Sequence, residues 1–389
     1  MTKLDEFIQE LCPDGVKYLP IPELFITRNG YTPSKANNEF WENGTIPWFR
    51  MEDIRENGRI LTTATQYVSE KAVKGKLFPA DSIIIATSAT IGEHALIKVP
   101  SLANQRFTYL TLKDEFKDCV DMMFVFYYCF RLDEYCKSHL NQGNFASVDM
   151  KQFAAFKFPV PPLPVQCEIV RILDNFTELT AELTAELTAR QKQYEYYRDM
   201  LLSFGENGGE ETGNNINFFL VAEIADTNIG LATTVTKYKA NQGVLLIHNS
   251  DIQENEIVLK QHEYITEAFA EKNHKKRLQE NDVITVHTGD VGTSAVISKE
   301  YAGAIGFTTI TSRIRNPQKV LPEYFCHYLN SHRCKAEIAS MTISDRSNLN
   351  QNCFEKLRIP IPPIDEQRRI VTILDHFSTL CTDLTSGLP

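Results

Sequence analysis

The chain has 389 residues, a length that suits two domains with separate hydrophobic cores. It contains no apolar run of 18 residues and no cleavable N-terminal signal, which predicts a cytoplasmic protein without a membrane anchor. The formal net charge of −10 argues against indiscriminate binding to nucleic acid. A nucleic-acid site here must therefore be a local concentration of basic and amide side chains, or partner subunits must supply phosphate contacts.

The sequence lacks the short motifs of the common catalytic and metal-binding classes. There is no G-x-x-x-x-G-K-[ST] loop, no H-E-x-x-H, no G-x-S-x-G and no Asn/Asp-Pro-Pro-Tyr/Phe segment. The nine cysteines include no C-x-x-C pair and the nine histidines have no metal-ligand spacing, so we predict reduced thiols and no metal site. Glu115 and Lys117 have nuclease-like E-x-K spacing, but such triplets arise by chance. We predict no catalytic residue, no cofactor in this chain and no small-molecule substrate.

Residues 1–157 predict a first module of mixed α and β structure. It opens with an amphipathic helix over residues 2–11, which ends at a Pro-Asp-Gly turn. The later elements are a strand over 45–54, two strands joined by a polar glycine turn over 76–97, a strand over 104–112, an aromatic helix over 121–139 and a polar loop over 141–145.

Residues 158–204 predict a long helix. After four prolines the segment runs without another Pro or Gly to Phe204, so the helix can extend over 40 residues, or about 60 Å. Apolar residues recur at a spacing of 3.5, which is typical of a coiled-coil seam. The seam positions are Leu173, Phe176, Leu183, Leu187, Tyr194, Tyr197 and Leu201. A helix of this length needs a partner helix.

The second half of the chain repeats the first with different polar turns. Residues 205–217 predict a polar, glycine-rich hinge, and residues 218–358 a second module. Residues 277–297 parallel 76–97, with Asp282 at the position of Asp81. A shared frame with altered polar turns is expected of two binding sites for different targets.

The predicted partner helix lies at the end of the chain, in residues 359–389. Residues 359–380 align without gaps on residues 158–179 and match them at 11 of 22 positions. The seam positions of this copy are Ile370, Leu374, Phe377 and Leu384. The repeat indicates two large modules, each closed by a Pro-Pro entry into a helix.

Three features together resemble the DNA-specificity (S) subunit of type I restriction–modification systems. They are the duplicated PxPPxxxQ and I-L-D-x-F units, the TAEL repeats at residues 180–187, and the strand-and-turn layout of each module. The resemblance covers essentially the whole chain. It implies two target recognition domains, each reading one half of a split DNA site, separated by a long antiparallel coiled-coil helical pair with a pseudo-two-fold internal repeat.

The same resemblance implies the partners. They are double-stranded DNA, two modification (methyltransferase) subunits, and restriction/translocase subunits, in the cytoplasm of a prokaryote. S-adenosylmethionine, ATP and Mg are then expected in the partner subunits and not in this chain, which is a non-catalytic recognition subunit.

Two positions depart from the family pattern. The PLxEQ signature keeps its form in the second copy, as PIDEQ, but the first copy reads PLPVQ at residues 162–166. This predicts that the first helix starts later than usual. The second copy ends three or four turns earlier than the first. This predicts a short distal helix and puts the docking of a second methyltransferase subunit there in question.

The TAEL repeats predict a ruler between the modules. Each repeat adds four residues, about 6 Å of helix, so a change in repeat number should alter the gap between the two half-sites. Plain helix-forming sequence is the alternative, because Ala, Glu and Leu all favour helices.

Polar side chains at turns that can reach base edges are the candidate DNA-binding residues. In the first module they are Arg50, Thr87, Ser88, Thr90, Asn104, Gln105, Arg106, Asn141, Gln142 and Asn144. In the second module they are His248, Asn249, His287, Thr288, Thr308, Thr309, Arg313, Ser344, Arg346 and Asn348. The alternative for each residue is a turn former on a solvated surface. Residues 272–277, KNHKKR, are candidates for phosphate contacts or for a solvated charged face.

The function we infer from the sequence is recognition of a split DNA site. A coiled-coil scaffold with two protein-binding modules remains an alternative, and DNA binding that weakens steeply with salt would separate the two. A nuclease acting alone is a third interpretation, which magnesium-dependent nicking by the purified chain would support.

Overall fold

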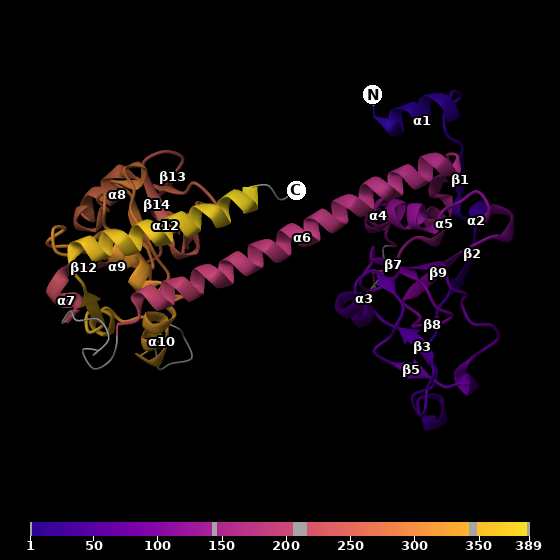
Figure 1. The fold of residues 1–389 in the computed structure, drawn as a ribbon, viewed down its shortest axis with the longest axis horizontal. Helices are drawn as coiled ribbons and strands as arrows, with labels where there is room; N and C mark the ends of the chain where they lie inside the picture. The colour runs from indigo at the N-terminus through magenta and orange to yellow at the C-terminus, as the bar shows by residue number, and fades with distance from the viewer. Residues whose placement is uncertain (1, 142–145, 205–215, 342–347, 387–389) are drawn as a thin grey trace. The chain divides into compact units, whose positions relative to one another are not determined.

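The computed structural model describes residues 2–141, 146–204, 216–341 and 348–386, with side chains described as far as residue 380. The chain forms two compact units, Met1–Leu179 and Thr180–Pro389, with the division inside one long helix. Each unit combines helices and strands (Figure 1), so the prediction of mixed α and β modules is confirmed.

The first unit contains a five-stranded sheet in the order β2-β9-β6-β7-β4 and a three-stranded sheet in the order β5-β3-β8. Its strands are β1 Tyr18–Pro20, β2 Phe25–Asn29, β3 Ile46–Phe49, β4 Ile60–Leu61, β5 Tyr67–Val68, β6 Ser82–Ala86, β7 His94–Ile97, β8 Leu102–Ala103, β9 Phe107–Leu112 and β10 Lys157–Pro159. Its helices are α1 Lys3–Leu11, α2 Ile21–Leu24, α3 Met51–Asn57, α4 Met122–Ser138, α5 Met150–Ala155 and the start of α6 Leu163–Leu202.

Strand β6 shows how this unit divides its core. Its residues alternate between the two faces of the sheet, as the period of two requires. Ile83 and Ile85 pack with helix α4 in one cluster, and Ile84 packs with the three-stranded sheet in another. Both faces are buried, which explains the continuous apolar run.

The second unit repeats this arrangement. Its strands are β11 Asn217–Leu220, β12 Ala225–Ile229, β13 Lys239–Ala240, β14 Val244–His248, β15 Ile252–Gln253, β16 Glu256–Ile257, β17 Tyr264–Ile265, β18 Val283–Val286, β19 Ser294–Val296, β20 Ile305–Phe307, β21 Thr309–Ile314 and β22 Arg358–Ile361. Its helices are α7 Val221–Ile224, α8 Glu267–Lys272, α9 Pro322–Leu329, α10 His332–Met341, α11 Gln351–Phe354 and α12 Ile364–Ser386, with the second part of α6. The main sheets have the orders β12-β21-β18-β19 and β13-β17-β14-β20.

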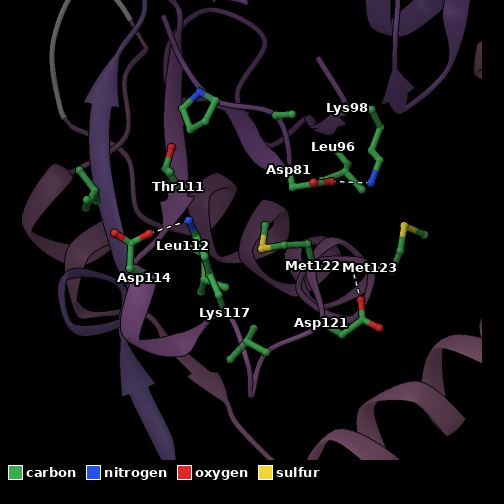
Figure 2. A pocket seen from close by; sticks show the side chains of 14 residues that line it. Asp81, Leu96, Lys98, Thr111, Leu112, Asp114, Lys117, Asp121, Met122 and Met123 are labelled. Carbon is green, nitrogen blue, oxygen red and sulfur yellow. Dashed lines mark hydrogen bonds and ion pairs between the residues drawn. The ribbon is translucent and has the colours of Figure 1, made fainter. Parts of the chain in front are cut away.

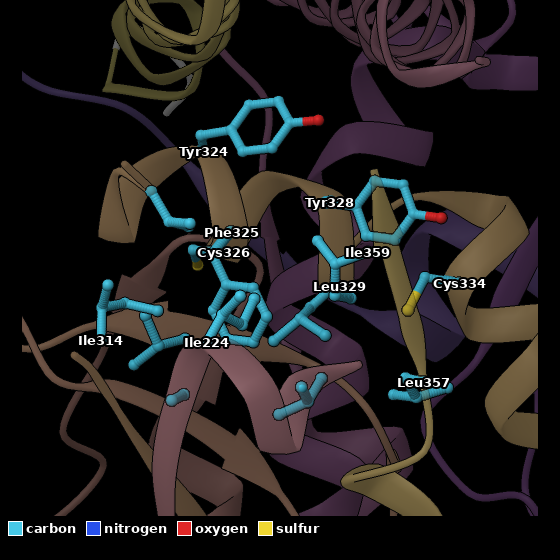
Figure 3. Packing of buried hydrophobic residues seen from close by; sticks show 14 of the residues in the cluster. Ile224, Ile314, Tyr324, Phe325, Cys326, Tyr328, Leu329, Cys334, Leu357 and Ile359 are labelled. Atoms are coloured by element: carbon cyan, nitrogen blue, oxygen red, sulfur yellow. The ribbon is translucent and has the colours of Figure 1, made fainter. Parts of the chain in front are cut away.

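Helix α9 is the centre of the largest buried cluster of this unit. Figure 3 shows Tyr324, Phe325 and Leu329 of α9 among Ile224 and Ile314. Helix α9 therefore takes the place that α4 has in the first unit.

The structure corrects the predicted alignment of the two modules by one residue. The Asp81 N–H donates to the carbonyl of Ile97 at 2.7 Å, and the Asn281 N–H donates to Ile297 at 2.9 Å. Both residues have positive φ, 57° and 71°, a conformation that Asp and Asn tolerate. Asn281, and not Asp282, is therefore the equivalent of Asp81.

The ends of each module pair with one another. Strand β1 pairs antiparallel with β10, with Leu19 opposite Phe158, and β11 pairs antiparallel with β22, with Phe219 opposite Ile359. The proposed boundaries after residues 157 and 358 therefore fall inside strands.

Helices α6 and α12 begin at equivalent positions, Leu163 and Ile364. The prediction of a later start for the first helix is wrong, because Pro164 lies in the first turn of α6, where no backbone N–H is required. Helix α6 has 40 residues and α12 has 23, so α12 is the shorter helix, as predicted, by somewhat more than the expected three or four turns.

A buried glutamine near the start of each helix fixes it to its module. The Gln166 side chain accepts from the N–H of Asp121 at 2.9 Å and donates to the carbonyls of Cys119 and Pro161 at 2.8 and 2.7 Å. Gln367 makes the same three bonds, to Leu321, Lys319 and Pro362, at 2.9, 2.9 and 2.8 Å. The repeated Gln of the sequence therefore docks each helix on its own module.

The predicted seam is only partly a helix-to-helix contact. In the second unit α12 runs antiparallel to the end of α6 (Figure 1), and the rings of Tyr197 and Phe377 stack at 5.2 Å. Ile370 and Leu374 are instead buried in the module core, because one face of α12 packs on the module.

The remaining seam positions divide in the same way. Tyr194 and Leu201 pack against that core, and Leu173, Leu183 and Leu187 are half-buried. Phe176 is 60% exposed, so the prediction that it lies in a closed seam is wrong. The Leu384 side chain lies outside the described residues.

Candidate nucleic-acid interface

In the first module, two parallel strands end side by side and deliver candidate residues to one edge. Strands β3 and β8 pair in parallel, with Phe49 opposite Ala103 as the last pair. Arg50 and Asn104 follow directly, and the Asn104 N–H donates to the Phe49 carbonyl at 3.0 Å. Carboxyl ends of neighbouring parallel strands meet at the same edge, so these two side chains are neighbours.

Arg50 is held at this edge by the residues around it. The Arg50 N–H donates to the buried carboxylate of Asp53 at 2.7 Å, and Asp53 also accepts from the N–H and hydroxyl of Thr65. The guanidinium lies 5.9 Å from the Trp48 ring and 3.9 Å from Glu52. The backbone of Arg50 is therefore rigid, and only a weak ion pair holds its charge.

Asn104 and Arg106 form a tight turn at the same edge. The Asn104 Oδ1 accepts from the Arg106 N–H at 3.0 Å, and the Thr87 N–H donates to the Arg106 carbonyl at 2.9 Å. The hydroxyl of Thr32 bonds to Gln105. The Arg106 side chain is exposed and makes no ion pair within the described part of the chain. Of the two arginines at this edge, Arg106 is therefore the one whose guanidinium has no ion-pair partner among the described residues.

The loop before α5 joins the same edge. Ser88 forms a β-bridge with Ser147, and the Asn141 amide donates to the Ser147 hydroxyl at 3.2 Å and to the Val148 carbonyl at 3.1 Å. Thr90 lies in the turn that follows Ser88. We define the first edge as the following residues: Arg50, Thr87, Ser88, Thr90, Asn104, Gln105, Arg106 and Asn141.

The second module builds an equivalent edge with different side chains. Strands β14 and β20 pair in parallel, with His248 opposite Phe307, so Asn249 and Thr308 follow at one edge. The Asn249 amide donates to the carbonyl of Thr288 at 2.6 Å. The second edge consists of the following residues: His248, Asn249, His287, Thr288, Thr308 and Asn348.

Backbone contacts close this edge in the same way as the first. The His287 N–H donates to the Thr308 carbonyl at 3.1 Å, and Thr288 forms a β-bridge with Asn348. In the first module Thr87 and Arg106 make the corresponding bond, and Ser88 the corresponding bridge. The frame of the two edges is therefore the same, and their chemistry differs.

The two histidines of the second edge are in different environments. Burial lowers the pKa of His287, so its imidazole is neutral at pH 7, with Nδ1 2.8 Å from the Thr288 hydroxyl. His248 Nε2 lies 3.5 Å from the Glu263 carboxylate, and its ring lies 5.2 Å from that of Phe307. A neutral imidazole offers one donor and one acceptor, which suits base edges.

The structure contradicts one predicted contact residue, Thr309, and gives another, Arg313, a partner within the sheet. Thr309 is the first residue of β21 and is fully buried, whereas its neighbour Thr308 is a half-buried turn residue. Arg313 makes a forked ion pair with the buried Asp282, with Nε 2.8 Å from Oδ1 and Nη2 2.7 Å from Oδ2. Asp282 needs that partner because a buried carboxylate must be compensated, so Arg313 stabilises the sheet.

Four candidates cannot be placed: Gln142, Asn144, Ser344 and Arg346 lie outside the described residues. Thr32 contacts the first edge through Gln105, but the sequence analysis did not predict it. It follows the turn Asn29-Gly30-Tyr31, and Gly30 of this turn lies against Asn104. The glycine at position 30 is the sequence feature that could have predicted this neighbour. Its backbone lies so close to Asn104 that a Cβ at position 30 would be 2.2 Å from the Asn104 carbonyl oxygen.

Outside the two edges, the described residues form pockets but no metal-binding group. The His, Cys, Asp and Glu residues of the described chain form no group that could hold a metal ion. A pocket of about 630 Å³ in the first module is lined by Ile26, Leu112, Met122 and the paired charges Asp81 and Lys98 (Figure 2). It lies at the end of the five-stranded sheet opposite to the first edge, because β6 runs from Ser82 beside the pocket to Ala86 beside the edge.

Comparison with known proteins identifies the family. The family model described as the type I restriction modification DNA specificity domain matches residues 13–190 and 215–389. The EcoprrI specificity subunit of Escherichia coli is 41% identical over 388 residues, covering 96% of this chain and 90% of the relative. The EcoR124I/EcoR124II specificity subunit of Escherichia coli is 37% identical over 201 residues, covering 49% of this chain and 48% of the relative.

This chain belongs to the type I DNA-specificity family. The prediction of that family is confirmed, and with it the prediction of a recognition subunit in place of an enzyme. The two matched stretches correspond to the two copies of the internal repeat.

Solved structures support the specificity-subunit fold. The S subunit of a type I restriction–modification system from M. genitalium aligns with a TM-score of 0.52 at 15% identity, over 96% of this chain and 93% of that chain. A chain from a structure of type I R-M complex assembly and conformational transition aligns with a TM-score of 0.65 at 17% identity, over 97% and 93%. Across the described residues, no helix is both long and apolar enough to cross a membrane.

Proposed function

We propose that each module reads one half of a split double-stranded DNA site through the first edge and the second edge. The observation that carries this is the repetition of one backbone frame with different side chains. Arg50, Asn104 and Arg106 supply guanidinium and amide groups in the first module, and Asn249, His287 and Thr308 supply amide, imidazole and hydroxyl groups in the second. Arg suits guanine and Asn suits adenine, so the two halves should differ in sequence.

The chain acts, in this proposal, as the specificity subunit of a larger complex. Methyltransferase subunits, two of them, and restriction/translocase subunits are the partners, and they carry S-adenosylmethionine, ATP and Mg. The sites of action are on DNA in the cytoplasm of a prokaryote. Helix α6 supports this role because residues 175–179 are exposed and offer a surface for a partner.

Helix α6 also supports a role in setting the spacer. Its TAEL repeats, residues 180–187, lie within one uninterrupted helix. A continuous helix transmits a change in length as a rotation and a translation, about 100° and 1.5 Å for each residue. The spacer between the half-sites should therefore depend on the repeat number.

The experiment that tests the function is methylome sequencing of a strain that expresses this chain with its methyltransferase, compared with the same strain without this gene. We expect the gene to add one split motif with two different half-sites around a fixed run of unspecified bases. An identical methylome in both strains, with chain and methyltransferase shown to co-purify, would contradict the proposal. It would favour a scaffold that binds proteins.

A further inference from the structure

Each module carries a short basic segment close to its edge. Lys74 and Lys76 precede β6, and Lys272 and Lys275 precede β18; all four side chains are exposed. None of the four makes an ion pair within the described residues. Their charges are therefore available to a ligand.

The two segments are held by equivalent strand residues. The Arg28 guanidinium donates to the Lys76 carbonyl at 3.0 Å, and the Asn228 amide donates to the Lys275 carbonyl at 2.9 Å. Arg28 is the fourth residue of β2, and Asn228 is the fourth residue of β12. Both bonds hold the backbone of the lysine and leave its ammonium group free.

In the first module one residue connects the basic segment to the edge. The Tyr31 hydroxyl accepts from the Lys74 N–H at 2.8 Å, and the Lys74 ammonium lies 5.6 Å from the Tyr31 ring. The Tyr31 N–H donates to the carbonyl of Ala103 at 2.8 Å. Ala103 precedes Asn104, so Lys74 lies beside the first edge.

The second module has the corresponding connection. The Lys276 ammonium donates to the Gly230 carbonyl at 3.0 Å, which holds the segment against the end of β12. The next residue, Leu231, donates to Gly306 and accepts from the Thr308 N–H, both at 2.8 Å. Lys275 therefore lies beside the second edge.

The neighbouring cations have structural tasks and are not free to bind a ligand. Lys276 binds the carbonyls of Ile229 and Gly230, and Arg277 pairs with Glu267. Of the three lysines in the KNHKKR segment, only Lys272 and Lys275 therefore have ammonium groups that are available to a ligand. The first module, which has no comparable run, presents an equivalent pair in Lys74 and Lys76.

We propose that Lys74, Lys76, Lys272 and Lys275 bind the phosphodiester backbone of the DNA, one pair beside each edge. This proposal rests on the proposed function and adds to it the contacts that do not depend on the DNA sequence. Phosphate contacts position a protein on the duplex while base contacts specify the sequence. A chain with a net charge of −10 needs such local positive charge beside each reading surface.

The test is DNA binding by the chain assembled with its methyltransferase, measured over a range of salt concentrations. The probes are a duplex that contains the methylome-defined site and a duplex of mixed sequence. The variants are K74Q/K76Q and K272Q/K275Q. The matched control is K98Q/K117Q, which removes the same charge at the opposite end of the first module, beside the pocket in Figure 2.

We expect each double variant to weaken binding to both duplexes by the same factor. The slope of log K against log salt should become shallower by about 0.9 for each phosphate that is no longer neutralised, so by up to about 2 for each pair. K98Q/K117Q should keep the wild-type slope, and K74R/K76R should restore it.

An unchanged slope in both double variants would overturn the proposal, as would weaker binding confined to the specific duplex. Failure of the proposed function is a separate result. In that case the wild-type complex binds the two duplexes equally well.

Discussion

Arg198 Nη1 lies 2.7 Å from Glu254 Oε2, and this ion pair joins α6 to the turn between β15 and β16. The Arg198 side chain is 5% exposed and its guanidinium lies 5.5 Å from the Tyr194 ring. Lys335 of α10 contacts the same carboxylate at 2.6 Å. The end of α6 is therefore fixed to the second module by charges that are largely removed from water.

Removal of this guanidinium should destabilise the second unit. We expect R198A to lower the free energy of unfolding by about 2–3 kcal/mol, somewhat less than for a fully buried pair because Glu254 is partly exposed. Urea unfolding measures this. R190A, which breaks the exposed Arg190–Glu186 pair of the same helix, should cost about 0.5 kcal/mol or less. Equal destabilisation by the two variants would contradict the prediction.

The glutamine contacts predict a second effect on stability. Q166L leaves the N–H of Asp121 and the carbonyls of Cys119 and Pro161 without their partner, and we expect the free energy of unfolding to fall by about 3 kcal/mol. Q367L should cost a similar amount in the other unit. Q191L changes an exposed residue of α6 and should stay within about 0.5 kcal/mol of wild type in the same urea experiment. A neutral Q166L would refute the docking role.

Arg106 should specify a base pair in one half-site only. We expect R106A to relax recognition at one position, with discrimination against the wrong base reduced by about 1–3 kcal/mol. Methylome sequencing of the variant strain measures this as methylation at degenerate sites. The other half-site should be unchanged, and relaxation in both halves would contradict reading by separate modules.

Deletion of Thr184–Leu187 should change the spacer and leave both half-sites intact. The deletion removes about 6 Å of α6 and keeps the helical phase nearly constant, because four residues approximate one turn. The same sequencing experiment reads the number of unspecified bases. A methylome with the wild-type spacer would assign the TAEL repeats to helix formation alone.

The repeat and the two edges could be predicted from the sequence because they depend on local pattern. Strand ends followed by Arg50, Asn104 and Asn249 are visible as apolar runs that stop at polar residues. The Pro-Pro entry marks where α6 and α12 begin, although Pro164 led to a wrong prediction of a later start for α6.

The remaining prediction errors have two causes. One is the face of a strand on which a side chain lies, and the other is a partner residue that is distant in the sequence. A shift of one residue in a strand exchanges its two faces, so Thr309 is buried although its neighbour Thr308 lies in the turn. The role of Arg313 could not be predicted because its partner Asp282 is distant in the sequence. Similarly, Ile370 and Leu374 have the spacing expected of a coiled-coil seam, but the same spacing also fits a helix that packs on a module core.

The paired end strands of each module have a consequence for how specificity changes. Leu19 lies opposite Phe158 and Phe219 lies opposite Ile359, so each module enters and leaves at neighbouring points. In the proposed function, everything between those points would form a cassette, because the helix that follows starts from the same strand. Recombination between genes would then supply a new half-site in one event, without a compensating change elsewhere in the subunit.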